Sequence, residues 1–289
     1  MSSRLKSVLW MVLWAACFSA AMTVVKFVEG VSTPMIVFLR FLISLLIFFP
    51  LLKKEKQNPL KTDHFPFHVL NAVFRIVALF STYYAYTNLP MGLAASIGYT
   101  GPIISILLAM MLLNEKVGAQ KWIAVTVGYT GVLFMFEPSN FSLTIALLIA
   151  LLANLMSSLA KITTKRLTKT DTPGQIIFLC NGIAAAIVMI YIFGTGEIPP
   201  QNTWAMLVIV GVFGSFSQFS YIKALQNSDV SSIAPFEYLR LIMAVPIGYF
   251  VFNEYLSVND MIGGFLIVIC SGYLVYREHQ KSKSPVNTQ

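Results

Sequence analysis

Long apolar runs dominate this chain and constrain its fold more than any other feature. Each run spans about 20 residues, which is the length that a helix needs to cross the hydrocarbon core of a bilayer. Ten runs are found, at residues 7–26, 33–52, 66–87, 92–113, 119–136, 140–160, 174–194, 203–224, 230–252 and 258–276. The runs are continuous, whereas the strands of a membrane barrel alternate in hydropathy. We therefore expect an all-α membrane protein with ten transmembrane helices.

The composition excludes several classes of protein. Hydrophobic residues make up 57% of the 289 residues and charged residues only 11%, against about 45–50% and about 25% in an average soluble domain. A chain this apolar does not suit a soluble enzyme, a disordered protein, a disulfide scaffold or a nucleic-acid binder. The first run follows Arg4 and Lys6 like a signal peptide, but the bulky Trp14 does not suit a cleavage site, so we expect an uncleaved helix.

The basic residues predict how the chain is oriented. With ten spans both termini lie on one side, and 16 of the 20 Lys and Arg residues fall there, against only Lys26 on the other side. Positive charge is enriched in cytoplasmic connections. We therefore expect a multi-pass protein of the inner (cytoplasmic) membrane with both termini in the cytoplasm.

The sequence also matches itself at an offset of 139 residues. Lys26 aligns with Lys165, Pro34 with Pro173 and Tyr99 with Tyr238, and Asn114-Glu115 aligns with Asn253-Glu254. This pattern predicts two five-helix repeats, at 1–137 and 138–277, and a cytoplasmic tail at 278–289. Because five is odd, the second repeat enters the membrane inverted. Inverted repeats are typical of secondary transporters that bind substrate between their halves.

These repeats resemble the EamA-type proteins of the drug/metabolite transporter superfamily. The likeness rests on the apolar-Asn-Glu ends of the fourth helix of each repeat, on the glycine-containing helices that follow, and on Phe38-Leu39-Arg40 and Ala234-Pro235-Phe236. Within the superfamily, the segment from Pro235 to Arg240 is similar to the ninth helix of bacterial S-adenosylmethionine uptake transporters. The resemblance implies transport by alternating access.

Ionisable residues inside predicted spans are the candidate substrate-binding residues, because such residues are costly in lipid unless they are paired or face water. They are Arg40, Arg75, Glu237 and Arg240, with Tyr99 and Tyr238 as aromatic neighbours. Glu237 and Arg240 are three residues apart and could form a structural ion pair on one helix face. Arg40 could equally be a fold residue whose charge reaches the interface or backbone carbonyls.

Other polar features suggest structural roles. Pro102 and Pro246 are expected to break the fourth and ninth helices, and the acids of the two Asn-Glu pairs are expected to cap helices or bridge them. No nucleotide-binding loop, metal-ligand cluster or nucleophile triad is found in the sequence, so we expect neither a cofactor nor an enzyme. The expected partners are the lipid bilayer and a small metabolite, with coupling to protons or a counter-substrate, in a monomer or homodimer.

The sequence therefore favours a secondary carrier for a small polar or zwitterionic metabolite. S-adenosylmethionine or a related amino-acid- or nucleotide-like compound is the most specific candidate. Three arginines against one glutamate within the spans favour a solute that carries a carboxylate or phosphate over a simple cation. An exporter of amino acids or drugs, a membrane enzyme acting on lipid-linked substrates and a channel are the alternatives.

The orientation can be tested with reporter fusions to the two ends of the chain. We expect an alkaline phosphatase fusion to be inactive, and a fluorescent protein fusion to be bright, at either terminus. Opposite results at the two termini would mean an odd number of spans and would rule out the inverted pair of repeats.

Overall fold

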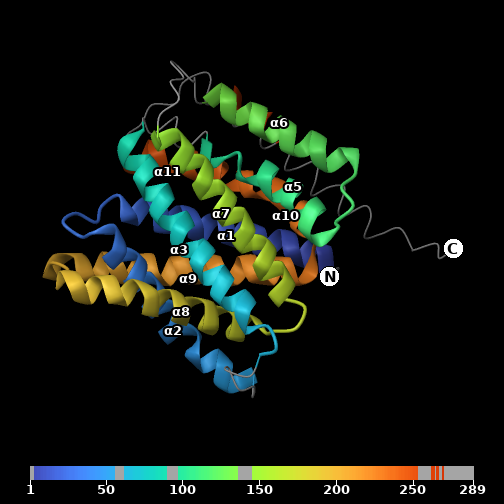
Figure 1. Ribbon diagram of the computed structural model, residues 1–289. Coiled ribbons are helices and arrows are strands. Elements are labelled where there is room, and N and C mark those ends of the chain that lie inside the picture. Colours follow the sequence, from blue (N-terminus) through green and yellow to red (C-terminus); the bar gives the residue numbers. More distant parts are fainter. Residues whose placement is uncertain are drawn as a thin grey trace.

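The computed structural model describes residues 3–55, 62–89, 97–135 and 145–252, together with 262, 263, 265, 266 and 269. Every regular element in this part is a helix. The elements are α1 (Ser3–Val25), α2 (Thr33–Glu55), α3 (Phe65–Asn88), α5 (Gly101–Leu113), α6 (Ala119–Met135), α7 (Ile145–Leu167), α8 (Pro173–Thr195), η1 (Gln201–Thr203), α9 (Trp204–Asn227), α10 (Val230–Ile233), η2 (Ala234–Tyr238) and α11 (Leu239–Phe252). Figure 1 shows them as one bundle.

Six of the described helices are long and apolar enough to cross a membrane. They are α1, α2, α3, α7, α8 and α9 with its preceding turn, and they match six of the predicted spans. The predicted spans 92–113, 119–136 and 230–252 correspond to the shorter helices α5, α6 and α11, and most of 258–276 lies outside the described residues. The all-helical architecture is confirmed, while the count of ten spans stays a prediction.

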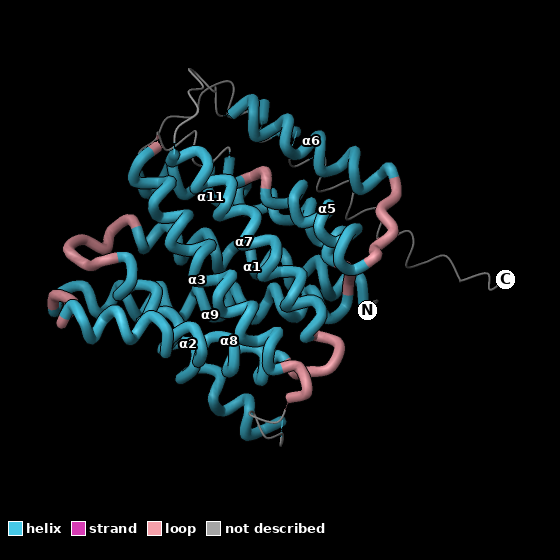
Figure 2. The backbone as a smooth tube through the Cα atoms, in the orientation of Figure 1, coloured by secondary structure: helices cyan, strands magenta, loops and turns pink. Residues whose placement is uncertain are grey.

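The 139-residue repeat is visible in the helix bounds and in the packing. Helix α3 begins at Phe65 and α9 at Trp204, 139 residues later. The pairs of packed helices follow the same equivalence: α1 packs on α9 as α7 packs on α3, and α2 packs on α9 as α8 packs on α3. The first helix of each repeat thus packs against the third helix of the other, so the repeats interleave (Figure 2).

The central helix pairs run antiparallel. In α1 and α9, the Ser7 hydroxyl donates to the Ala224 carbonyl while the Trp14 ring lies against that of Tyr221. In α2 and α8, Val37 packs with Val188 and, towards the other end, Phe48 packs with Ile176. Antiparallel helices interlock their side chains along the full length of both partners, which builds a continuous apolar core.

Polar contacts tie the ends of the bundle together. The buried His68 of α3 lies 2.6 Å from the carboxylate of Asp171 in the turn between α7 and α8. Elsewhere, the carboxylate of Glu197 accepts from the backbone N–H and the hydroxyl of Ser32, just before α2. Both carboxylates anchor a connection that would otherwise leave polar groups unpaired.

The acid of the first Asn-Glu pair caps a helix, as predicted. Asn114 ends α5 in the left-handed conformation, with φ of 54°. The Glu115 carboxylate then accepts the backbone N–H groups of Val230 and Ser231, at 3.0 and 2.9 Å, at the start of α10. A carboxylate is favoured there because the first N–H groups of a helix have no partners within it. The second pair, Asn253-Glu254, lies outside the described residues.

Candidate functional site

A break in the predicted ninth helix places the candidate acid. The run 230–252, predicted as one helix, is divided into α10, the 3₁₀ segment η2 and α11. The break coincides with Pro235 in the first turn of η2, because proline lacks the N–H that would continue the α-helical ladder. Pro246, where we expected the break, lies inside α11, and Pro102 lies in the first turn of α5. Glu237 falls within η2 and is buried.

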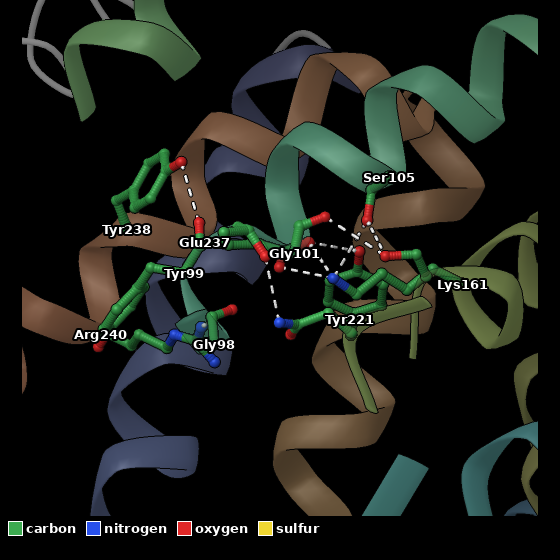
Figure 3. Close-up of polar contacts among 12 residues, drawn as sticks. Gly98, Tyr99, Gly101, Ser105, Lys161, Tyr221, Glu237, Tyr238 and Arg240 are labelled. Carbon is green, nitrogen blue, oxygen red and sulfur yellow. Dashed lines mark hydrogen bonds and ion pairs between the residues drawn. The ribbon is translucent and has the colours of Figure 1, made fainter. Parts of the chain in front are cut away.

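Glu237 forms an ion pair with Lys161 of α7 (Figure 3). The Lys161 ammonium lies 2.6 and 2.8 Å from the two carboxylate oxygens, and the hydroxyl of Tyr221 in α9 donates to the same carboxylate at 3.0 Å. The side chain of Glu237 is only 3% exposed and that of Lys161 only 15%. A buried carboxylate needs both a counter-charge and hydrogen bonds, and this one has both.

Serine hydroxyls extend this ion pair to a helix of the first repeat. Lys161 also donates to the hydroxyl of Ser105 in α5, at 3.3 Å, and Ser105 bonds to Ser158 of α7 at 3.0 Å. Ser158 in turn donates to the carbonyl of Gly101. The ammonium is therefore held in position from both repeats.

The structure does not pair Glu237 with Arg240, which was one of the two interpretations of their spacing. The Arg240 guanidinium lies 4.3 Å from the centre of the Tyr99 ring and 5.5 Å from that of Phe18, and it reaches the Gly98 carbonyl at 3.5 Å. Its buried Nε atom has no hydrogen-bond partner. Glu237 lies in η2 and Arg240 in the first turn of α11, and the carboxylate of Glu237 is directed to Lys161 of α7 and Tyr221 of α9 instead. Arg240 is thus stabilised by aromatic faces rather than by a carboxylate.

Tyr238 is packed tightly on the other side of η2. It is only 1% exposed, and its hydroxyl donates to the backbone carbonyls of Tyr99 and Val125. A Cβ atom at Gly128 of α6 would lie 2.6 Å from the Tyr238 ring, so only glycine allows this approach. Figure 3 shows Tyr238 beside Glu237, but its burial favours a role in positioning η2 over direct contact with a solute.

Arg75 belongs to a second polar cluster, between α3 and α7. Its Nε donates to the Asn71 side-chain oxygen at 2.7 Å, and Nη2 reaches the Thr164 hydroxyl at 3.3 Å. Arg40 of α2 is close enough to Arg75 for the two charges to repel each other. Arg40 packs on α9, where its Nε would lie 2.6 Å from a Cβ at Gly214.

Tyr221 connects the two clusters. Its hydroxyl donates to Glu237 and is also within electrostatic range of the Arg75 guanidinium. The structure thus brings Glu237 and Arg75, which are far apart in the sequence, near one tyrosine.

Lys161 and Tyr221 are the site residues that the sequence analysis missed. Lys161 was assigned to a cytoplasmic connection because the apolar run was ended at residue 160, whereas α7 continues to Leu167. Its last turns are stabilised by Thr163 and Thr164, whose hydroxyls bond back to the Ala160 carbonyl. Extending the predicted helix through these threonines would have placed Lys161 inside the bundle.

The comparisons with known proteins agree with this architecture. The profile of the EamA-like transporter family matches the chain twice, at residues 5–137 and 144–276. The chain belongs to the EamA-like transporter family. It is 26% identical to an S-adenosylmethionine uptake transporter of Rickettsia prowazekii, over 88% of this chain and 86% of that protein. It is 28% identical to a riboflavin transporter of Brucella anthropi, over 88% and 92% of the two chains.

A solved crystal structure shares the fold. It superposes with a TM-score of 0.79 at 15% identity, over 98% of this chain and 99% of that one. Because the EamA-like family and the named relatives are transporters, this chain is a membrane transporter and not an enzyme. We therefore interpret the buried charges as candidates for binding the transported solute.

The ion pair can be tested by removing one partner or both. We expect Lys161→Met to destabilise the protein by about 3–5 kcal/mol, because Glu237 is left buried without a counter-charge. The double variant Lys161→Met/Glu237→Gln should recover much of that loss. The free energy of unfolding of each variant is measured with purified protein in detergent. Arg166→Met, which changes an exposed residue on the same helix, is the control. Additive losses in the double variant would show that the two side chains are not coupled.

Proposed function

We propose that this protein is a secondary active transporter that moves a small zwitterionic metabolite across the inner membrane by alternating access. In this proposal two inverted five-helix repeats, at 1–137 and 138–277, cross the membrane ten times and leave the tail at 278–289 in the cytoplasm. S-adenosylmethionine uptake is the most specific form of the proposal.

The observation that carries the proposal is the buried contact between Lys161 and Glu237 at the break in the helix. Broken helices and buried charges mark the substrate sites of many transporters, because the freed polar groups are available to a solute. Both charges come from the second repeat, while Ser105 reaches Lys161 from the first. Tyr99 and Phe18 of the first repeat lie against the neighbouring Arg240. A site built from both repeats can change its access when the repeats move relative to each other.

The chemistry around Glu237 favours a zwitterion with an aromatic part. S-adenosylmethionine, named as the cargo of one group of relatives, carries a carboxylate, an ammonium, a sulfonium and a planar adenine. Glu237 can attract its cationic groups and the nearby arginines its carboxylate, while Tyr99 and Tyr221 offer ring faces. Riboflavin, the named cargo of other relatives, shares the planar ring but has no charge to match these residues. It is the second candidate.

The direction of transport and the oligomeric state are further parts of the proposal. Uptake is favoured by the named activity of the relatives, and export of amino acids or drugs is the alternative within the superfamily. A monomer or a homodimer would each suffice, because both sides of the site come from one chain.

Uptake into proteoliposomes tests the cargo. We expect saturable uptake of labelled S-adenosylmethionine that unlabelled compound suppresses and that riboflavin suppresses only weakly. Empty liposomes and liposomes with Lys161→Met/Glu237→Gln are the controls. Saturable uptake of riboflavin without uptake of S-adenosylmethionine would change the cargo and leave the transporter class intact.

Glu237 is also the proposed site of proton coupling. The ionisable groups around it are Lys161 from α7, Tyr221 from α9 and Arg240 from α11, while α5 contributes the neutral Ser105. A proton and the cationic group of the solute would bind this carboxylate alternately, each in place of Lys161.

We expect Glu237→Gln to abolish the stimulation of uptake by an imposed pH gradient, because a neutral amide cannot exchange the proton. Residual uptake should be independent of pH. Glu197→Gln is the matched control, since it neutralises a carboxylate in the connection after α8. Full pH-driven uptake by Glu237→Gln would exclude this residue as the coupling group.

A further inference from the structure

Arg75 is positioned by Asn71, a residue that is itself held by several hydrogen bonds. Asn71, one turn earlier in α3 and fully buried, donates through its amide nitrogen to the Ala160 carbonyl and to the hydroxyls of Thr163 and Thr164, at 2.7, 2.7 and 2.9 Å. Its side-chain oxygen is thereby turned to the Arg75 Nε. The neighbouring α7, which packs along α3 in Figure 1, thus fixes the direction of the guanidinium.

The partners of Arg75 are neutral. Its hydrogen bonds go to an amide oxygen and a threonine hydroxyl, and the like charge of Arg40 also acts on it. Within the described residues, both ion pairs involve other groups, His68 with Asp171 and Lys161 with Glu237. A guanidinium stays charged at any physiological pH. Holding it half-buried beside a second arginine is costly unless an anion is present for part of the transport cycle.

We propose that Arg75 binds the carboxylate of the transported molecule, while Glu237 binds its cationic group. This inference rests on the proposed function and adds the orientation of the solute. Two of the five guanidinium N–H groups have partners, and the planar fork suits a carboxylate, which it can bind through two parallel hydrogen bonds. Asn71 is a positioning residue that aims the fork.

Tyr221 sets the relation between the two poles. Its hydroxyl donates to Glu237 and is also within electrostatic range of Arg75, so the acidic pole and the basic pole both lie near this side chain. A solute with a cation at one end and a carboxylate a few bonds away can lie along this tyrosine. A solute that lacks a carboxylate would leave Arg75 without a counter-charge. A solute that lacks a cationic group would gain nothing from Glu237, which would keep Lys161 as its only counter-charge.

The test compares ligands that differ only in the carboxylate. We expect the wild-type protein to bind S-adenosylmethionine about 30–100-fold more tightly than its decarboxylated analogue, as measured by competition in a binding assay with purified protein. In Arg75→Gln the two ligands should bind with similar, weak affinity. Arg75→Lys, which keeps the charge but not the fork, should retain only part of the preference. Arg166→Gln is the control for loss of an arginine and should keep the full preference.

A second measurement does not depend on the cargo or on transport. At equal ionic strength, the midpoint of thermal unfolding of the wild-type protein should be higher in sodium formate than in sodium gluconate, whose anion is too bulky for the same contact. Ligands that bind only the folded state raise this midpoint. The difference should vanish in Arg75→Gln and persist in Arg166→Gln.

The outcomes separate this inference from the proposed function. An equal loss of affinity for both ligands in Arg75→Gln, or an effect of formate that survives in Arg75→Gln, would overturn the carboxylate site while S-adenosylmethionine remained the cargo. If the wild-type protein binds neither ligand, the proposed cargo is wrong, and the formate measurement alone decides whether Arg75 is an anion site. If Arg75→Gln does not fold, Arg75→Lys decides: an undiminished preference for the carboxylate would overturn the inference.

Discussion

The structure depends on the requirement that charges and backbone groups inside a membrane bundle find partners within the protein. Glu237 meets this requirement through Lys161 and Tyr221, which come from two other helices. Breaking the helix at Pro235 is what allows Glu237 to face them both. The same requirement explains why Asn71, Thr163 and Thr164 bond to one another and to backbone carbonyls. Most polar side chains described in this bundle bond to one another or to the backbone. Polar groups without a full set of partners are therefore candidates for function.

Interleaving of the two repeats has a mechanical consequence. Because α1 packs on α9 and α7 on α3, neither repeat can move as an independent body without separating these antiparallel pairs. The proposed change of access therefore involves movement of such mixed pairs. The close approach of Tyr238 to Gly128 fixes η2 to α6, so movement of η2 would carry α6 with it or open that contact.

The two charged clusters differ in how fully they are satisfied. The carboxylate of Glu237 has an ammonium and a hydroxyl, and Lys161 has Glu237 and Ser105. Arg75 has neutral partners, and Arg240 has aromatic rings, one weak carbonyl contact and an unpartnered Nε. Within the described residues these clusters therefore carry more positive than negative charge. This imbalance is the physical basis for proposing a solute that brings its own carboxylate.

The sequence by itself determined the helical class, the repeat, the family and most of the charged candidates. Apolar length and a fixed offset of 139 residues are local or one-dimensional properties, so they can be read without coordinates. It could not identify the partner of Glu237, because pairing across 76 residues of chain depends on how α7 lies against η2. Nor could it predict that Arg240 would stack on Tyr99, since that contact joins residues 141 positions apart and depends on how the first repeat lies against α11. Only the tertiary structure decided which charges are neutralised and which are left for a ligand, because burial and neighbours are properties of the packed bundle.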